Sequence, residues 1–268
     1  MIRRPLPIPC EGATLAATLD LPDGQPATTG LLIITGGNEI RSGAWTGQAQ
    51  LAARLAAAGH AVLRFDRRGV GDSEGENTGF TASAPDITAA LTAFRAACPD
   101  LTRIVAWGNC DAASALMLGS GLGADGLILS NPWTFEISGE DSGQAENTPA
   151  PPQALRAYYL QRLANPVALL RLLKGKISLG GLVKSLIAAL RPAPPPTSLA
   201  QDMAEGLARF PGPARILLAS RDRTAQAFLA SWAKNDPRLA QCPGASHSFV
   251  EESAREWLFG EILEGLKE

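Results

Sequence analysis

The sequence is poor in cysteine and histidine, the side chains that proteins use most often to hold zinc. Its 268 residues include two histidines and four cysteines, and the cysteines are Cys10, Cys98, Cys110 and Cys242. They lie far apart and lack the C-x2-C spacing of a zinc site. We therefore expect no bound metal and no cofactor. A chain of this length can build a core without disulfides, so we expect free thiols in a reducing compartment.

The sequence also lacks a long hydrophobic run and an excess of either charge. No uninterrupted apolar stretch approaches the roughly 18 residues that cross a bilayer. The first residues carry charge without the apolar stretch of a secretory leader, so we expect a cytoplasmic protein. The 24 Lys and Arg residues nearly balance the 26 Asp and Glu residues. This balance leaves no basic field for a nucleic-acid backbone, and we expect no nucleic-acid partner.

The sequence does contain an alternation of short β-type runs with helix-period segments, from about residue 30 to residue 132. The apolar runs are residues 31–34, 61–65, 104–107 and 127–129. Between them, residues 48–58 and 86–97 repeat apolar side chains every three or four positions. This alternation predicts an α/β fold with a mostly parallel sheet flanked by helices.

Two proline clusters interrupt this alternation. Residues 149–152 and 192–196 are rich in proline and bracket two helical stretches that are apolar and basic. Residues 147–201 contain no acidic residue, and their basic residues are Arg156, Arg162, Arg171, Lys174, Lys176, Lys184 and Arg191. We therefore predict a core formed by residues 1–132 and 206–268, and a basic helical cap inserted over residues 133–205.

A motif around Cys110 has the pattern of a nucleophile elbow. Residues 107–114 read Trp-Gly-Asn-Cys-Asp-Ala-Ala-Ser and join a predicted strand to a predicted helix. This tight turn needs small residues two before and two after its centre, here Gly108 and Ala112, and it lifts the central side chain above the sheet. Backbone N–H groups at a helix N-terminus favour a thiolate, so we predict that Cys110 is a nucleophile. The alternative is a small buried cysteine that fills the junction.

A thiolate that transfers acyl groups needs an imidazole, and His60 and His247 are the two candidates. His60 precedes a predicted strand and is expected at the end of the sheet opposite Cys110. His247 follows the last short strand, on the side where open α/β folds bind ligands, so we predict that it is the base. Asp222 completes the order nucleophile, acid, histidine. The alternatives are a loop histidine without a role and an aspartate that caps a helix or forms a surface ion pair.

Donors for an oxyanion are expected after the first core strand and after the nucleophile. Gly37 and Asn38 stand at the first position and Asp111 at the second. We therefore predict an oxyanion hole formed by their backbone N–H groups. Glu39 and Arg41 are expected near the cleft, with Arg41 as a clamp for a substrate carboxylate or phosphate.

A glycine-rich segment, residues 65–75, follows another strand and reads Phe-Asp-Arg-Arg-Gly-Val-Gly-Asp-Ser-Glu-Gly. It lacks the lysine and spacing of a P-loop and does not fit the dinucleotide pattern G-x-G-x-x-G. We interpret it as a structural loop in which Asp66 and Arg68 hold the backbone turn.

These motifs together resemble the α/β-hydrolase superfamily over nearly the whole chain. The resemblance is carried by D-x-R-G-x-G-x-S over residues 66–73, the elbow over 108–112, Asp222 and His247. More narrowly, Gly36-Gly37 with Arg41, residues 63–66 and residues 108–114 look like the exosortase A system-associated hydrolase 1 family. The resemblance implies an α/β-hydrolase fold and cytoplasmic acyl or ester chemistry, in bacteria that export exopolysaccharide and sort PEP-CTERM proteins. The sequence departs from the serine-hydrolase pattern at position 112, where alanine replaces the usual glycine.

The leading functional hypothesis is an acyl hydrolase or acyltransferase that forms a thioester on Cys110 from a small-molecule ester or thioester. The predicted basic cap favours a thioester carried by coenzyme A or an acyl carrier protein. One alternative is a lactone hydrolase similar to dienelactone hydrolases, and another is a non-catalytic binding protein that keeps the fold. The apolar-basic stretches also fit contact with a membrane surface, although we favour a lid over the cleft.

Overall fold

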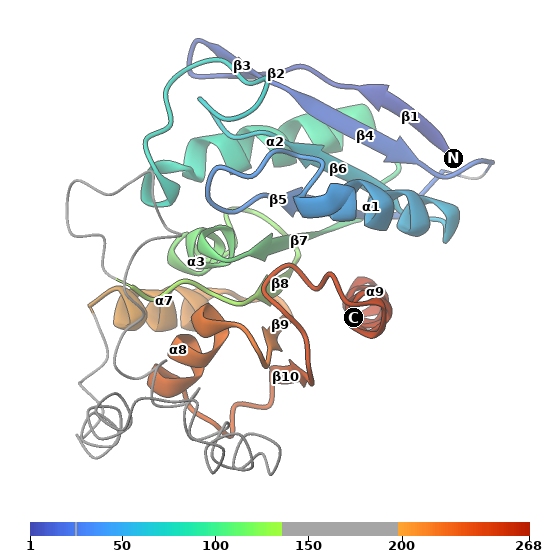
Figure 1. Cartoon of the computed structure of the whole chain (residues 1–268). Coiled ribbons are helices and arrows are strands. Elements are labelled where there is room, and N and C mark those ends of the chain that lie inside the picture. The colour runs from blue at the N-terminus through green and yellow to red at the C-terminus, as the bar shows by residue number, and fades with distance from the viewer. Residues whose placement is uncertain (25, 136–197) are drawn as a thin grey trace, which may run out of the picture.

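The computed structural model describes residues 1–24, 26–135 and 198–268 and contains a twisted sheet with helices on both faces (Figure 1). Eight strands of the described residues form this sheet in the order β1-β4-β6-β5-β7-β8-β9-β10. Their bounds are β1 Ile2–Pro5, β4 Ala17–Leu21, β5 Thr29–Ile34, β6 Ala61–Phe65, β7 Arg103–Asn109, β8 Gly126–Ser130, β9 Ala214–Ala219 and β10 Leu239–Cys242. The strands from β6 to β10 run parallel, which confirms the predicted α/β class.

The N-terminal strands form the antiparallel edge of the sheet. β4 pairs with β6, and β1 pairs with β4. The strands β2 (Ile8–Cys10) and β3 (Ala13–Leu15) make a separate two-stranded sheet around a turn at Glu11 and Gly12. All four residues of β1 are exposed, so no alternation of apolar and polar side chains marks this strand in the sequence.

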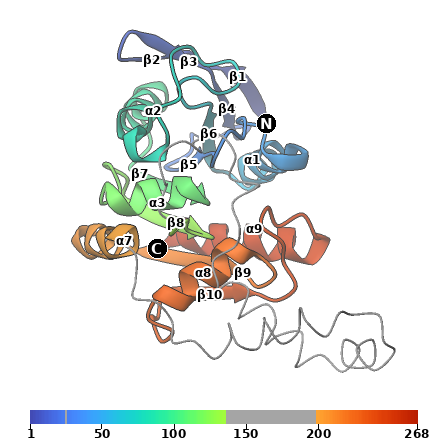
Figure 2. The same cartoon turned by 60° about the vertical axis from the view of Figure 1, so that its left-hand side comes forward.

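Helices cover both faces of the sheet. On one face lie α1 (Gly47–Ala57) and α9 (Glu252–Lys267), and on the other lie α2 (Ala84–Ala97), α3 (Asp111–Leu118), α7 (Ser198–Arg209) and α8 (Arg223–Ser231). Figure 2 shows α1 and α9 across the sheet from α2, α3 and α7. Successive side chains of a strand point to opposite faces, so β5 contributes Leu31 to one core cluster and Leu32 to the other. Among the helices described, none has the length and apolar character that a membrane span needs.

Helix α7 changes the boundary of the predicted cap. It begins at Ser198, inside the predicted insertion, and buries Ala200, Met203, Gly206 and Leu207 in the core. Residues 198–205 therefore belong to the packed core. The predicted basic cap falls mostly on residues 136–197, which lie outside the described residues, so the cap stays a prediction.

The parallel strands place the loops that carry the candidate site at one edge of the sheet. Because β5 to β10 all run in the same direction, the loops that follow them begin at the same edge. Cys110 directly follows β7, Asn131 directly follows β8, and Asp222 and His247 lie in the loops after β9 and β10. Residues separated by more than a hundred positions thereby come into contact.

Gly206 generates a test of the packing between α3 and α7. A Cβ atom at this position would lie 2.0 Å from the carbonyl oxygen of Met117, a backbone atom of α3. We expect Gly206→Ala to lower the free energy of unfolding by about 1–3 kcal/mol, because the two helices must move apart. Urea denaturation measures this change.

Gly260→Ala in α9 is the matched control for that test. A Cβ atom there meets nothing within 4 Å, so the change should raise the free energy of unfolding by up to about 1 kcal/mol through helix propensity. Equal effects from the two glycine substitutions would contradict the close contact of α7 with α3.

Candidate active site

Cys110 occupies the tight turn between β7 and α3. Its backbone has φ 62° and ψ −127°, a conformation that costs a residue with a Cβ on the order of 1–3 kcal/mol. Two glycines make room for the turn. A Cβ on Gly108 would lie 2.7 Å from the backbone of Ala112, and a Cβ on Gly36 would lie 2.5 Å from the carbonyl oxygen of Asn109. Strand and helix therefore approach closely, as the small residues of the motif predict.

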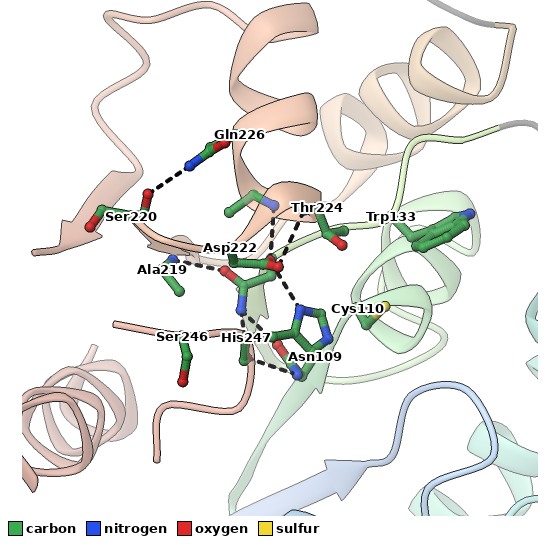
Figure 3. Close-up of polar contacts among 12 residues, drawn as sticks. Asn109, Cys110, Trp133, Ala219, Ser220, Asp222, Thr224, Gln226, Ser246 and His247 are labelled. Carbon is green, nitrogen blue, oxygen red and sulfur yellow. Dashed lines mark hydrogen bonds and ion pairs between the residues drawn. The ribbon is translucent and has the colours of Figure 1, made fainter. Parts of the chain in front are cut away.

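The His247 ring lies between Asp222 and Cys110, and Figure 3 shows it paired with the Asp222 carboxylate. The imidazole Nδ1 lies 3.0 Å from Asp222 Oδ2. The Cys110 side chain lies close enough to the same ring to raise its pKa. The structure thus brings together the three residues predicted as nucleophile, acid and base. His60 lies directly before β6, at the opposite edge of the sheet.

Asp222 also begins α8. Its Oδ1 accepts the N–H of Thr224 at 3.3 Å, and its Oδ2 accepts the N–H of Ala225 at 3.0 Å. These bonds make Asp222 the N-cap of the helix and hold its carboxylate in one orientation. The side chain of Asp222 is 8% exposed, whereas that of His247 is 38% exposed. The sequence left two roles open for Asp222, a helix cap and the partner of His247. In the structure the same Asp222 side chain has both roles.

The surroundings of His247 favour its protonated form. Burial lowers the pKa of the ring, but hydrogen bonds and negative charge from Asp222 and Cys110 outweigh burial and raise the pKa from 6.5 to about 10. At neutral pH the ring therefore carries a positive charge beside the Cys110 sulfur. An imidazolium in this position stabilises a neighbouring thiolate and has a proton available for a leaving group.

The predicted oxyanion donors lie together, but the N–H of Gly37 already has a hydrogen-bond partner. Gly37 donates its N–H to Asp111 Oδ1 at 2.8 Å. Asp111 Oδ2 lies 3.4 Å from Arg67 Nη2, which also donates to the Gly37 carbonyl oxygen. Among the described residues, no hydrogen bond engages the N–H of Asn38, and the N–H of Asp111 stands in the first turn of α3, where helices leave donors free. Asn38 and Asp111 therefore fit an oxyanion better than Gly37 does.

Glu39 lies in the segment between β5 and α1 and lines the cavity between α1 and α9. Its carboxylate accepts the N–H of Ala44 and, at 3.0 Å, the Nε2–H of Gln48. Burial raises the pKa of Glu39, and the hydrogen bond from Ala44 and the charge of His247 oppose this rise. The carboxylate thus orders the segment between β5 and α1 and lies within electrostatic range of the imidazole.

Arg41 has a different role from the predicted substrate clamp. Its guanidinium pairs with Asp66 and, at 2.8 Å, with Asp72. Asp66 also accepts the backbone N–H of Asp72 at 3.1 Å, and Arg68 pairs with Asp86 at 2.6 Å. Two carboxylates neutralise Arg41, which corrects the clamp assignment. Within residues 65–75 Asp66 holds the backbone turn, as predicted, whereas the Arg68 side chain pairs with Asp86 outside the loop.

A cavity of about 670 Å³ lies between α1 and α9, and its wall includes none of Cys110, Asp222 and His247. Asn109 and Ser248, the sequence neighbours of Cys110 and His247, contribute to its wall. Its apolar lining includes Leu51, Trp107, Phe249 and Leu258. This volume is within the range of small-molecule sites. In the part of the chain that the structure describes, no group of three or more His, Cys, Asp or Glu side chains is placed to hold a metal ion.

Sequence reasoning misses Asn131, which follows β8 and is fully buried. Its side chain bonds to Ala219, to Asn109 and to the carbonyl oxygen of His247. The signal in the sequence is a polar pair, Ser130-Asn131, at the end of an apolar run. That signal marks a strand end, but it does not identify partners that lie 22, 88 and 116 positions away.

The sequence also matches a known protein family. The sequence matches the family described as "Alpha/beta hydrolase family" over residues 31–261. The chain belongs to this family. The predicted α/β-hydrolase fold is therefore confirmed, whereas the narrower exosortase A system-associated family stays a prediction. A search of curated protein sequences finds no match.

This α/β hydrolase is similar in fold to many solved structures. XC6422 from Xanthomonas campestris, described as a serine hydrolase without lid, is 15% identical with TM-score 0.59, covering 99% of this chain and 94% of that one. Est1E from Butyrivibrio proteoclasticus with ferulic acid bound is 19% identical with TM-score 0.62, covering 98% and 100%. GrgF from Penicillium sp. sh18 is 16% identical with TM-score 0.66, covering 100% and 98%. At these identities the likeness concerns the fold.

The raised pKa of His247 predicts how stability depends on pH in this α/β hydrolase. Between pH 6.5 and about 10 the folded chain keeps a proton on His247 that the unfolded chain releases. The stabilisation from this proton is complete below about pH 6.5 and is lost as the pH rises to about 10. Urea denaturation of the unsubstituted protein and of His247→Gln should therefore show a difference in unfolding free energy that shrinks across this range.

His60→Gln is the control for that pH series. Burial lowers the pKa of His60 below 6.5, so this ring is neutral in both states above about pH 6.5 and should add no slope there. A difference between the unsubstituted protein and His247→Gln that stays constant or grows with pH would contradict the assigned ion pair.

Proposed function

We propose that the protein is an acyl hydrolase or acyltransferase that works through a thioester on Cys110. The observation that carries the proposal is the position of His247, whose Nδ1 lies 3.0 Å from Asp222 and whose ring neighbours a cysteine held at positive φ. In this arrangement Cys110 is the nucleophile, the imidazole of His247 serves as acid and base, and Asp222 orients the imidazole. The family supports ester or thioester chemistry on a small molecule.

In the first step the Cys110 thiolate attacks the carbonyl carbon of the substrate. The carbonyl oxygen becomes an oxyanion and accepts hydrogen bonds from the backbone N–H groups of Asn38 and Asp111. When the intermediate collapses, the bond to the leaving group breaks and the imidazolium of His247 gives that group its proton. The acyl group is then bound to the Cys110 sulfur as a thioester.

In the second step the neutral His247 removes a proton from water or from another acceptor. The acceptor oxygen attacks the thioester carbonyl, and the Cys110 thiolate leaves as the imidazolium is restored. Asp222 stays ionised, orients the ring through Nδ1 and stabilises its positive charge. Hydrolysis and transfer differ in which acceptor enters, and neither requires a cofactor.

We further propose a thioester of coenzyme A or of an acyl carrier protein as the substrate. Residues 147–201 contain seven basic residues and no acidic one, a composition that attracts phosphate or an acidic carrier. The resemblance to the exosortase A system-associated hydrolase 1 family supports an acyl substrate linked to exopolysaccharide or PEP-CTERM systems.

Alkylation by iodoacetamide tests the nucleophile without knowledge of the substrate. At about pH 6, where ordinary thiols are protonated, Cys110 should react faster than the other three cysteines. Burial raises the pKa of each of these, to about 11 for Cys10. Peptide mass mapping identifies the labelled residue, and His247→Ala should remove the selectivity because the imidazolium is lost.

His60→Ala is the matched control for the labelling, since His60 lies at the other edge of the sheet and should leave it unchanged. If Cys110 reacts no faster than Cys10, Cys98 and Cys242, or if His247→Ala has no effect, the catalytic proposal fails. A binding protein that retains the fold then becomes the leading interpretation.

The salt dependence of turnover tests the charge of the substrate. As ionic strength rises from about 0.01 M to about 1 M, the Debye length falls from about 30 Å to about 3 Å. Turnover of an acyl-coenzyme A thioester should fall steeply over this range, whereas turnover of the neutral ester p-nitrophenyl acetate should change little. The same salt response for both substrates would contradict recognition of an anionic carrier.

A further inference from the structure

The side chain of Asn131 contacts all three segments that carry the candidate triad. Its Oδ1 accepts the N–H of Ala219, the last residue of β9, at 2.8 Å. Its Nδ2 donates to Asn109 Oδ1 at 3.0 Å, next to Cys110 in sequence, and to the carbonyl oxygen of His247 at 3.0 Å. One amide therefore joins the end of β7, the end of β9 and the histidine loop.

The neighbours of Asn131 determine the orientation of its amide. The backbone N–H of Ala219 can only donate, so it must face the Oδ1 atom of Asn131. The carbonyl oxygen of His247 can only accept, so it must face Nδ2. The second Nδ2 hydrogen then points to Asn109 Oδ1, which turns the Asn109 amide so that its own Nδ2 approaches the His247 carbonyl at 3.4 Å. The network has one consistent arrangement.

Other contacts hold the histidine loop on its far side. Ser246 donates through both its N–H and its Oγ–H to Glu251 Oε2 at 3.0 Å, within the loop itself. Gly244 donates to Ser220 Oγ at 2.8 Å, towards the loop after β9. Towards the elbow strand, Phe249 packs in the same core cluster as Trp107, and the two asparagines supply the hydrogen bonds that set the distance at His247. That distance decides whether the ring reaches Cys110.

The turn at Asn131 does not itself require this network. Its φ of 45° is left-handed, a conformation that Asn and Asp tolerate better than most residues. Its backbone N–H continues the sheet by donating to the Leu217 carbonyl oxygen at 2.9 Å. The side-chain amide is additional to these local needs, and its two donors are directed at the site.

We propose that Asn131 is a positioning residue whose amide holds the backbone of His247, so that the imidazole reaches Asp222 and Cys110 at the same time. The inference rests on the proposed function, because it assigns a role within that site. Asn109 assists as the acceptor that orients the Asn131 amide.

The test compares Asn131→Asp with Ser130→Ala. Asn131→Asp keeps the size, the tolerance of positive φ and the acceptor for Ala219, but it loses both Nδ2 donations. Ser130→Ala removes a neighbouring fully buried hydroxyl that accepts from Trp107 Nε1 at 2.8 Å. It is therefore a matched control for the loss of a buried hydrogen bond.

The readout is the rate of Cys110 alkylation by iodoacetamide as a function of pH, together with turnover of p-nitrophenyl acetate. Asn131→Asp should lower the rate at about pH 6 and kcat on the order of 10- to 100-fold with KM retained, because the imidazolium is displaced from the sulfur. Ser130→Ala should keep the pH profile of the unsubstituted protein. A shared profile for the two variants overturns the proposal, since a merely structural residue behaves as the control does.

Two further outcomes are decided by the same measurements. If circular dichroism shows that Asn131→Asp does not fold, Asn109→Ala takes its place, and it should weaken alkylation at about pH 6 in the same direction. An unchanged profile in Asn109→Ala overturns the proposal. If the unsubstituted protein shows no Cys110 selectivity that depends on His247, the proposed function fails first, and the role of Asn131 fails with it.

Discussion

The backbone of Cys110, held at φ 62° between β7 and α3, is the constraint on which the rest of the site depends. Gly36 and Gly108 allow the turn, because a Cβ on either would overlap neighbouring backbone atoms. The turn places the sulfur at the carboxyl edge of the sheet, beside the first N–H groups of α3. The loops after β5, β9 and β10 meet at this edge because the strands are parallel.

Electrostatic pairing organises the groups around the sulfur. His247 lies between Asp222 and Cys110, and its pKa is raised to about 10 although burial acts against its charge. Asp111 is turned towards the N–H of Gly37 and the guanidinium of Arg67. Each charge at this edge therefore has a nearby opposite charge or donor, which a partly buried site requires.

The elements that the sequence predicts are those formed by residues close together in the chain. Apolar periodicity marks β5, β6, β7 and β8, and the small residues around Cys110 mark a tight turn. Chain order alone selects His247 over His60, because the two histidines fall at opposite edges of a parallel sheet. The start of α7 at Ser198 escapes this reasoning, since its buried side depends on packing against α3 and not on composition.

The sequence by itself determined the α/β class, since periodicity is a local property of the chain, and it predicted the tight turn at Cys110 with Asp222 and His247 as partners from the order of these residues along the chain. Only the tertiary structure decided which polar side chains pair. It assigned Arg41 to Asp66 and Asp72, engaged the N–H of Gly37 with Asp111, and joined Asn131 to His247. Hydrogen bonds and ion pairs need contact within a few ångströms, and partners as far apart as 116 positions meet only when the sheet brings their loops to one edge.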